Sequence, residues 1–161
     1  MSSQLAAKMV KELEASKEFF DRSTRPLEEP DSAFTPVQGL MTVAQQVAHT
    51  AHTLDWFAQG VTRPEGFDLD FAAHAVEINK VTSLAQARAW HDRAHKNFVT
   101  TIGCMSDAEL FAPLPAGPVM GGAPKLAVVG AASDHTAHHR GVLTVYTRAL
   151  GKTPPMPYME M

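Results

Sequence analysis

The segment D-H-T-A-H-H-R-G-V-L-T-V-Y-T-R-A-L-G, residues 134–151, carries the strongest structural signal in this chain. Within it, His135 and His139 are four residues apart, so on a helix their imidazole rings point to the same side. A buried imidazole costs free energy unless hydrogen bonds or a metal ion satisfy both of its nitrogens. If this face is buried, the pair is a candidate for two ligands of one metal ion.

A helical wheel drawn at about 100° per residue places the pair on the inward side. Apolar residues gather on that side of a helix that begins near Pro124: Val128, Ala131, Ala132, Val142, Leu143, Tyr146, Ala149 and Leu150. Polar residues take the opposite side: Ser133, Arg140, Thr144, Thr147 and Arg148. His138 falls at the edge of the apolar face. This pattern is typical of a helix packed into a bundle core.

Three further stretches show helical periodicity, and no alternating strand pattern lies between them. With the last helix, the predicted ranges are residues 3–22, 42–60, 83–103 and 124–150. Thr42 with Gln45, and Ser83 with Gln86, have the spacing of capping boxes that open the second and third helices. Gly60 is placed to end the second helix. We therefore expect an all-α four-helix bundle.

The connections between these helices differ in length. Residues 61–82, with a short helix around residues 71–78, form a connector that permits a crossover between the second and third helices instead of a tight hairpin. Residues 113–124 contain four prolines and three glycines, so they are predicted to be a loop. The proline-rich tail, residues 152–161, is expected to run extended along the surface or onto a neighbouring subunit. Residues 1–161 are predicted to form a single domain.

Composition limits the classes of partner. The chain has 161 residues, of which 45% are hydrophobic, and a formal net charge of −3. This charge argues against nucleic acid and anionic membranes as partners, and no apolar run reaches the ~20 residues of a bilayer span. A lone cysteine, Cys104, excludes an internal disulfide and is expected to be a small core residue near a helix end. Without a signal-peptide core, we expect a cytoplasmic protein.

A third metal ligand must come from another helix, because a catalytic zinc-type site normally has three protein ligands and an open position. The second helix offers His49 and His52. On its wheel His52 belongs to the polar arc, whereas His49 lies toward the apolar side. His49 is therefore the better candidate, although a boundary histidine that bonds to backbone or water is an equally good interpretation of His49 alone.

A rival pair lies on the third helix, where His91 and His95 are also four apart among apolar residues. The local pattern favours His135 with His139, because charged neighbours interrupt the apolar face around the rival pair. One histidine of the rival pair could still form a hydrogen bond to a metal ligand without binding the metal itself. His74 and His138 are predicted to lie in solvent or at the boundary.

Other catalytic patterns are missing from the sequence. It contains no phosphate-binding glycine loop, no G-x-S-x-G, no H-E-x-x-H, and no Glu-x-x-His in the last helix that would indicate a di-iron bundle. Arg140 is predicted to face outward, and Tyr146 to be a buried tyrosine with a bonded hydroxyl. No side chain is identified as a general base, so the catalytic residues stay unknown.

The motif H-x-x-x-H-R-G at residues 135–141, followed by L-T-V-Y-T-R-A-L-G, resembles the last core helix of the DinB-like proteins, which is typically H-x-x-x-H-R-G-Q and then an aliphatic and aromatic run. The segment V-A-Q-Q-V-A-H-T-A-H-T-L-D-W-F, residues 43–57, resembles the family's helix with the upstream metal histidine. The resemblance covers about residues 5–151. Val142 stands where the family usually has Gln.

This resemblance implies a four-helix bundle, commonly dimeric, that binds one divalent metal through His49, His135 and His139. It selects the last helix over the third, and zinc, nickel, iron and manganese all suit the family pattern. Members with assigned reactions include metal-dependent transferases that join a low-molecular-weight thiol to an electrophile, and related isomerases.

Three hypotheses about function follow. The first is a metal-dependent enzyme of the thiol-dependent S-transferase or hydrolase type that acts on a small molecule, with a homodimer as its assembly. The second is a non-catalytic or stress-associated bundle with a structural metal, whose fourth ligand would be a residue such as His52 or His95. The third is a metal-free interaction domain in which the histidines satisfy one another and water.

Overall fold

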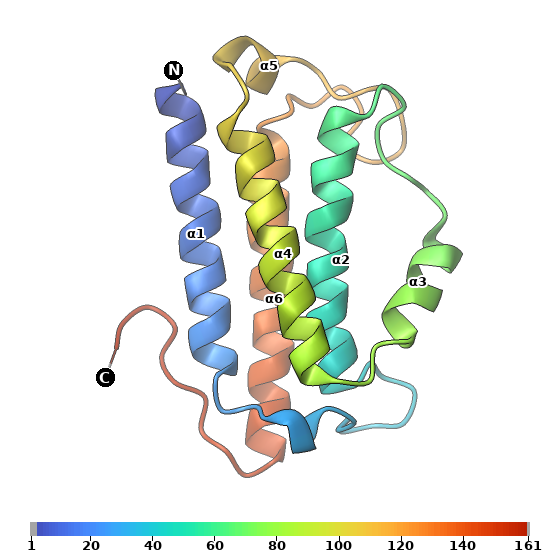
Figure 1. The fold of residues 1–161 in the computed structure, drawn as a ribbon, viewed down its shortest axis with the longest axis vertical. Helices are drawn as coiled ribbons and strands as arrows, with labels where there is room; N and C mark the ends of the chain where they lie inside the picture. Colours follow the sequence, from blue (N-terminus) through green and yellow to red (C-terminus); the bar gives the residue numbers. More distant parts are fainter. Residues whose placement is uncertain (1–2, 161) are drawn as a thin grey trace.

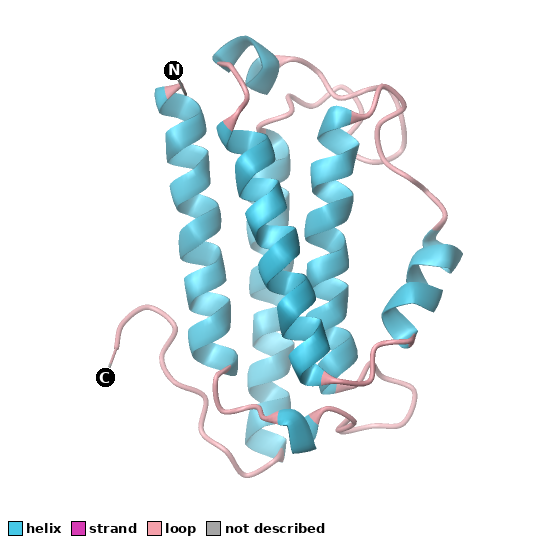
Figure 2. Ribbon diagram, in the orientation of Figure 1, coloured by secondary structure: helices cyan, strands magenta, loops and turns pink. Residues whose placement is uncertain are grey.

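The predicted all-α bundle is present in the computed structural model, which describes residues 3–160 (Figure 1). Helices and loops account for this part of the chain, and it contains no strand (Figure 2). The elements in chain order are α1 (Gln4–Thr24), the 3-10 turn η1 (Glu29–Asp31), α2 (Val43–Thr62), α3 (Phe71–Asn79), α4 (Leu84–Gly103), α5 (Asp107–Phe111) and α6 (Ala127–Ala149). The four long helices α1, α2, α4 and α6 form the bundle.

The predicted crossover between the second and third bundle helices is present, and it sets the topology. In Figure 1, α2 runs upward, the connector with α3 returns the chain to the lower end, and α4 runs upward beside α2. Helices α1 and α6 both run downward. Helix α2 packs against α4 and α6, and α1 packs against the same two helices. Each helix therefore has one parallel and one antiparallel neighbour.

The helix ends follow the sequence signals with three differences. Thr42 and Gln45 make the full capping box of α2. At the start of α4 the Ser83 hydroxyl accepts a hydrogen bond from the Gln86 backbone N–H, but the Gln86 side chain does not bond back to the Ser83 backbone. Helix α2 continues past Gly60 to Thr62. Gly60 is instead a site of close approach, since an added Cβ would lie 2.2 Å from the Phe67 ring.

The third difference lies at the start of the last helix. It begins at Ala127 instead of near Pro124. Backbone bonds from Lys125 N to Ala112 O (2.9 Å) and from Leu126 N to Leu110 O (2.9 Å) hold the preceding residues in the loop. Tertiary pairing of the loop thus delays the helix.

A polar layer divides the core in two. The upper apolar cluster includes Leu13, Leu54, Phe57, Phe98 and Val128, and the lower one includes Phe20, Val47, Leu84, Leu143 and Tyr146. Between the two clusters along the helices lie Lys17, His49, His91, His135 and His139. The histidines predicted from the sequence therefore sit halfway along the bundle, where apolar packing is interrupted.

The C-terminal segment folds back beside α1 (Figure 1). Lys152 pairs with Asp31 (2.6 Å), and Arg22 donates hydrogen bonds to the Pro157 carbonyl and to Glu160. Within residues 3–160, no helix combines the length and hydropathy that crossing a membrane requires.

Candidate metal centre

Three imidazole rings from two antiparallel helices meet in the polar layer. His49 comes from α2, and His135 and His139 come from α6. One nitrogen from each ring lies within 4.8 Å of the other two, and the ring centroids are 4.5–4.9 Å apart. A metal site needs several His, Cys, Asp or Glu side chains close together. Within the described residues, these three histidines form the one group of at least three such side chains that is close enough to hold a metal ion.

Gln46 fixes the orientation of His139. Nδ1 of His139 lies 2.6 Å from Oε1 of Gln46, an arrangement in which the ring nitrogen donates and the amide oxygen accepts. This bond leaves Nε2 of His139 as the unprotonated nitrogen, the form that binds metals. Gln46 was missed from the sequence. The available signal was its position three residues before His49, on the same side of the helix.

The other two rings point their Nε2 atoms at each other. Nε2 of His135 lies 3.1 Å from Nε2 of His49 and 3.5 Å from Oγ1 of Thr53. The Thr53 hydroxyl donates to the His49 carbonyl at 2.9 Å. Nδ1 of His49 is buried and has no hydrogen-bond partner in the described part of the chain. Among the described residues, therefore, the Nε2 atom of His49 has only another imidazole nitrogen as its partner, and its Nδ1 atom has none.

Burial keeps these rings neutral. Desolvation, with smaller contributions from neighbouring histidines, lowers the pKa of His135 to about 4 and that of His139 to about 3. The same causes lower the pKa of His49. A ring with such a pKa is uncharged at neutral pH, and the uncharged ring is the one with a lone pair available for a metal.

These residues fit a divalent metal. Two imidazole nitrogens bound to one tetrahedral zinc ion at about 2.0 Å stand about 3.3 Å apart, close to the 3.1 Å between His49 and His135. Three neutral imidazoles are also a common protein donor set for zinc, and imidazole suits nickel and iron as well. The geometry therefore provides a three-histidine cluster able to bind a metal.

The rival pair on α4 lies elsewhere. His91 stacks on the Phe20 ring of α1, with centroids 4.7 Å apart, and Nε2 of His95 bonds to the Leu13 carbonyl at 3.0 Å. Both rings face α1, whereas the cluster lies between α2 and α6.

A pocket of about 370 Å³ opens beside the cluster, between α2 and the crossover helix α3. His49 and His135 line it. His52 and His74 also line it, with ring centroids 4.6 Å apart and side chains 13% and 16% exposed. The sequence placed His52 on the polar arc of its helix and His74 in solvent or at the boundary, and both are half-buried. Their arrangement depends on where α3 packs, which no local pattern encodes.

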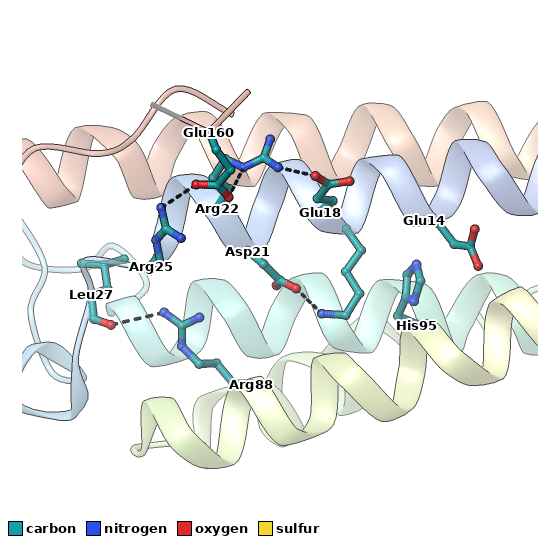
Figure 3. A pocket seen from close by; sticks show the side chains of 10 residues that line it. Glu14, Glu18, Asp21, Arg22, Arg25, Leu27, Arg88, His95 and Glu160 are labelled. Carbon is teal, nitrogen blue, oxygen red and sulfur yellow. Dashed lines mark hydrogen bonds and ion pairs between the residues drawn. The ribbon is translucent and has the colours of Figure 1, made fainter. Parts of the chain in front are cut away.

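A larger hollow of about 810 Å³ lies between α1, α4 and the C-terminal segment (Figure 3). Its charged side chains largely pair with each other, as Arg22 does with Glu18 and Glu160. Arg88 donates to the Leu27 carbonyl at 3.2 Å. None of the clustered histidines lines this groove, so its size alone does not make it the candidate site.

Three other expectations have mixed outcomes. Tyr146 is buried and its hydroxyl donates to the Met41 carbonyl at 3.1 Å, as expected for a structural tyrosine. Arg140 lies over the Phe19 and Tyr158 rings, at 5.9 and 5.7 Å from their centroids, and so contacts α1 and the tail.

The prediction for Cys104 was wrong: it is exposed at the end of α4, because the core-facing residue of that turn is Ile102.

Known proteins share this fold. The sequence model described as DinB superfamily matches residues 12–143. YfiT from Bacillus subtilis, described as a probable metal-dependent hydrolase with an unusual four-helix bundle topology, aligns with a TM-score of 0.70 and 17% identity over 95% of this chain and 91% of its own. YjoA, a DinB-like protein from the same organism, aligns with a TM-score of 0.62 and 16% identity over 99% of this chain and 100% of its own. No curated protein matches the chain significantly in sequence.

Proposed function

The chain belongs to the DinB superfamily, and from that premise we propose that it is a metal-dependent enzyme that acts on a small molecule. One observation carries the proposal: three neutral imidazoles lie close together, and two of them, His49 and His135, line a pocket of about 370 Å³. Clustered ligands beside a cavity of this size are the usual arrangement of a catalytic metal site.

In this proposal His49, His135 and His139 hold one divalent ion, with zinc, nickel, iron and manganese as the candidates. Gln46 orients His139 by accepting a hydrogen bond from its Nδ1–H through Oε1. When bound, such an ion supplies a positive charge that lowers the pKa of a nucleophile near it. The buried position of the three rings limits competition by protons, because each ring stays neutral at neutral pH.

His52 and His74 are the proposed proton-transfer groups. They are the titratable side chains that line the pocket beside His49 and His135. Outside the pocket, Glu77 and Asp68 approach them, with Nε2 to carboxylate distances of 4.0 Å for His52 and 3.6 Å for His74. A carboxylate next to an imidazole helps to hold the ring in place. Burial, with a smaller contribution from His74, lowers the pKa of His52 despite the opposing effect of the nearby carboxylates.

The proposed reaction is hydrolysis or a thiol-dependent S-transfer. The description of YfiT as a probable metal-dependent hydrolase supports hydrolysis, whereas the DinB-like resemblance of the sequence supports transfer to a thiol. Both reactions need the same element, a nucleophile activated at the histidine cluster next to a bound substrate.

The alternative, a structural metal in a non-catalytic bundle, requires a closed shell of four protein ligands. The two candidates for a fourth ligand are engaged elsewhere. His95 bonds to the Leu13 carbonyl, and the His52 ring lies tilted against His74 with its Nε2 atom 4.0 Å from Glu77. The pocket that reaches His49 and His135 also favours catalysis over a closed site.

The first test is the metal content of the tag-free protein and of the variants His135→Ala and His139→Ala. We expect near-stoichiometric metal in the unmodified protein and its loss in both variants. The second test adds 2-mercaptoethanol to cobalt-substituted protein. A changed cobalt spectrum supports an open, catalytic site, and an unchanged spectrum supports the structural alternative. Absence of metal from the unmodified protein after reconstitution would reject both.

We further propose a cytoplasmic homodimer that uses a low-molecular-weight thiol and has neither nucleic acid nor membrane partners. The family resemblance supports the dimer, and Val145, which is apolar yet 61% exposed on α6, is a candidate contact. Sedimentation that shows only monomer would contradict the dimer.

A further inference from the structure

Half of the side chains that line the pocket beside the histidine cluster are apolar. Six of the lining residues carry apolar side chains: Met41, Trp56, Phe57, Phe71, Ala75 and Ile78. They come from the loop before α2, from α2 itself and from α3, so the crossover connection completes the wall. A cavity with this lining gains free energy by removing apolar ligand surface from water.

Trp56 gives the wall a fixed aromatic surface. Its Nε1 donates to the Asp68 carbonyl at 2.7 Å, a bond that ties α2 to the connector. The indole ring lies 5.4 Å from Phe57 and 6.2 Å from Phe71, measured between ring centroids. An aromatic ring of a ligand placed among these side chains would make offset or edge contacts of the kind that stabilise aromatic clusters.

The polar residues of the wall carry no permanent charge. They are four histidines, Thr53 and Asn79, and no Lys, Arg, Asp or Glu lines the pocket in the described part of the chain. Two carboxylates that do not line it, Glu77 and Asp68, contact His52 and His74, with side chains 66% and 46% exposed. In the metal-free protein, an ionised ligand group inside the pocket would lose its hydration without gaining a permanent counter-charge from the wall.

We infer that the pocket takes an uncharged, apolar molecule with an aromatic-sized body, whose reactive end lies against His49 and His135. This inference rests on the proposed function in one respect, that the pocket holds the substrate of the cluster. It identifies the apolar substrate, and not an ionic thiol, as the reactant that occupies the cavity. The charged groove along α1 and α4, in contrast, is lined by paired ions and offers no such wall (Figure 3).

Two dyes that differ by one anionic group test the inference. N-phenyl-1-naphthylamine is neutral, and 8-anilino-1-naphthalenesulfonate has the same aromatic framework with a sulfonate. Fluorescence titrations of the full chain, both metal-loaded and metal-free, measure the binding of each dye. We expect one site for the neutral dye and, in the metal-free protein, binding of the sulfonate to that site at least about tenfold weaker, since the wall provides no counter-charge.

A matched pair of variants locates the binding site. Ala75 lines the pocket, whereas Ala73, two residues earlier on α3, does not, and both are exposed. Ala75→Phe should fill the cavity and weaken binding of the neutral dye at least about tenfold, whereas Ala73→Phe should change it less than about twofold. Far-UV circular dichroism checks that both variants keep the helical content of the parent.

The inference is overturned if neither dye binds, if the sulfonate binds the Ala75-sensitive site of the metal-free protein as tightly as the neutral dye, or if both variants have the same effect. Metal content measured on the same samples separates this inference from the proposed function. Neutral dye bound to a protein that takes up no metal would preserve the apolar site and reject the metal enzyme. Metal bound to a protein that binds no dye would preserve the metal enzyme and reject the apolar site.

Discussion

Two pairs of histidines, one on α6 and one on α4, have the same spacing and reach the same polar layer but have different surroundings. His135 and His139 meet His49 of α2, with Nε2 of His135 and His49 3.1 Å apart. The His91 ring instead stacks on the Phe20 ring, with ring centroids 4.7 Å apart. Its Nε2 atom is buried and has no hydrogen-bond partner in the described structure. The neighbouring helix therefore decides what an i, i+4 pair of histidines does.

The difference follows from which residue the opposing helix supplies at the level of the pair. Helix α2 supplies a nitrogen ligand, His49, and an amide, Gln46, that orients His139. Helix α1 supplies an aromatic ring, Phe20, and a backbone carbonyl, Leu13 O. Only the first set brings nitrogens of three imidazoles within 4.8 Å of one another in the described part of the chain.

The largest expected effect comes from removing the ligand that distinguishes the two pairs. His49→Ala should weaken metal binding at least about a thousandfold, because each ligand of a protein zinc site carries several kcal/mol of the binding free energy. His95→Ala should leave metal affinity unchanged. Competition titrations with a chelating indicator measure both, and equal losses in the two variants would remove the distinction between the pairs.

Gln46 provides the next largest effect. Gln46→Leu should weaken metal affinity by about tenfold to a hundredfold, as expected when the group that orients a ligand histidine is lost. Gln59→Leu, on an exposed position of the same helix, is the matched control. An unchanged affinity in Gln46→Leu would show that the contact between Gln46 and His139 does not support the cluster.

Low pH should destabilise the protein through His91, a member of the pair on α4. Burial, with smaller repulsion from Lys17, lowers the pKa of His91 to about 3, whereas the unfolded chain binds this proton near pH 6.5. Because the unfolded state takes up the proton first, the free energy of unfolding falls as the pH drops from about 6.5 toward 3, and the loss is absent above that window.

His91→Leu should remove this part of the acid sensitivity. Between pH 6.5 and pH 5 the contribution of His91 is on the order of 2 kcal/mol, so the variant should lose less stability over that interval by about this amount. Asp92, Arg88 and His95 also act on His91 and remain in the variant. Urea unfolding of metal-free protein at the two pH values measures the difference, and parallel losses in parent and variant would contradict the assignment.

The smallest effect concerns His95. Its Nε2 donates to the Leu13 carbonyl at 3.0 Å, which ties α4 to α1. His95→Ala should therefore lower the free energy of unfolding by about 1 kcal/mol, the typical net value of a hydrogen bond. Chemical denaturation checks this value. A loss of metal from this variant, with stability unchanged, would reverse the roles assigned to the two pairs.

Local patterns predicted much of the fold. The inward placement of His135 and His139 follows from their spacing within an apolar helical face, and Thr42 with Gln45 formed the predicted capping box. The long connector before Leu84 correctly indicated a crossover. These features depend on residues less than two turns apart or on connection length, so they can be recognised without knowledge of the neighbours.

Other features were outside the reach of local patterns. Gly60 looked like a helix end and is instead the place where Phe67 packs on α2. His74 looked like a surface residue of a connector and lies with His52 in the wall of the pocket. In each case the partner comes from a segment whose position is set by packing.

The sequence by itself determined that the chain forms a helical bundle with histidines on its inward faces, because helix period, caps and turn residues act over short separations. The tertiary structure alone decided that His49 faces His135 while Phe20 faces His91, and that α3 closes an apolar pocket beside the first group. The physical reason is that a ligand cluster depends on the register between helices, and that register is fixed by the packing of the whole core.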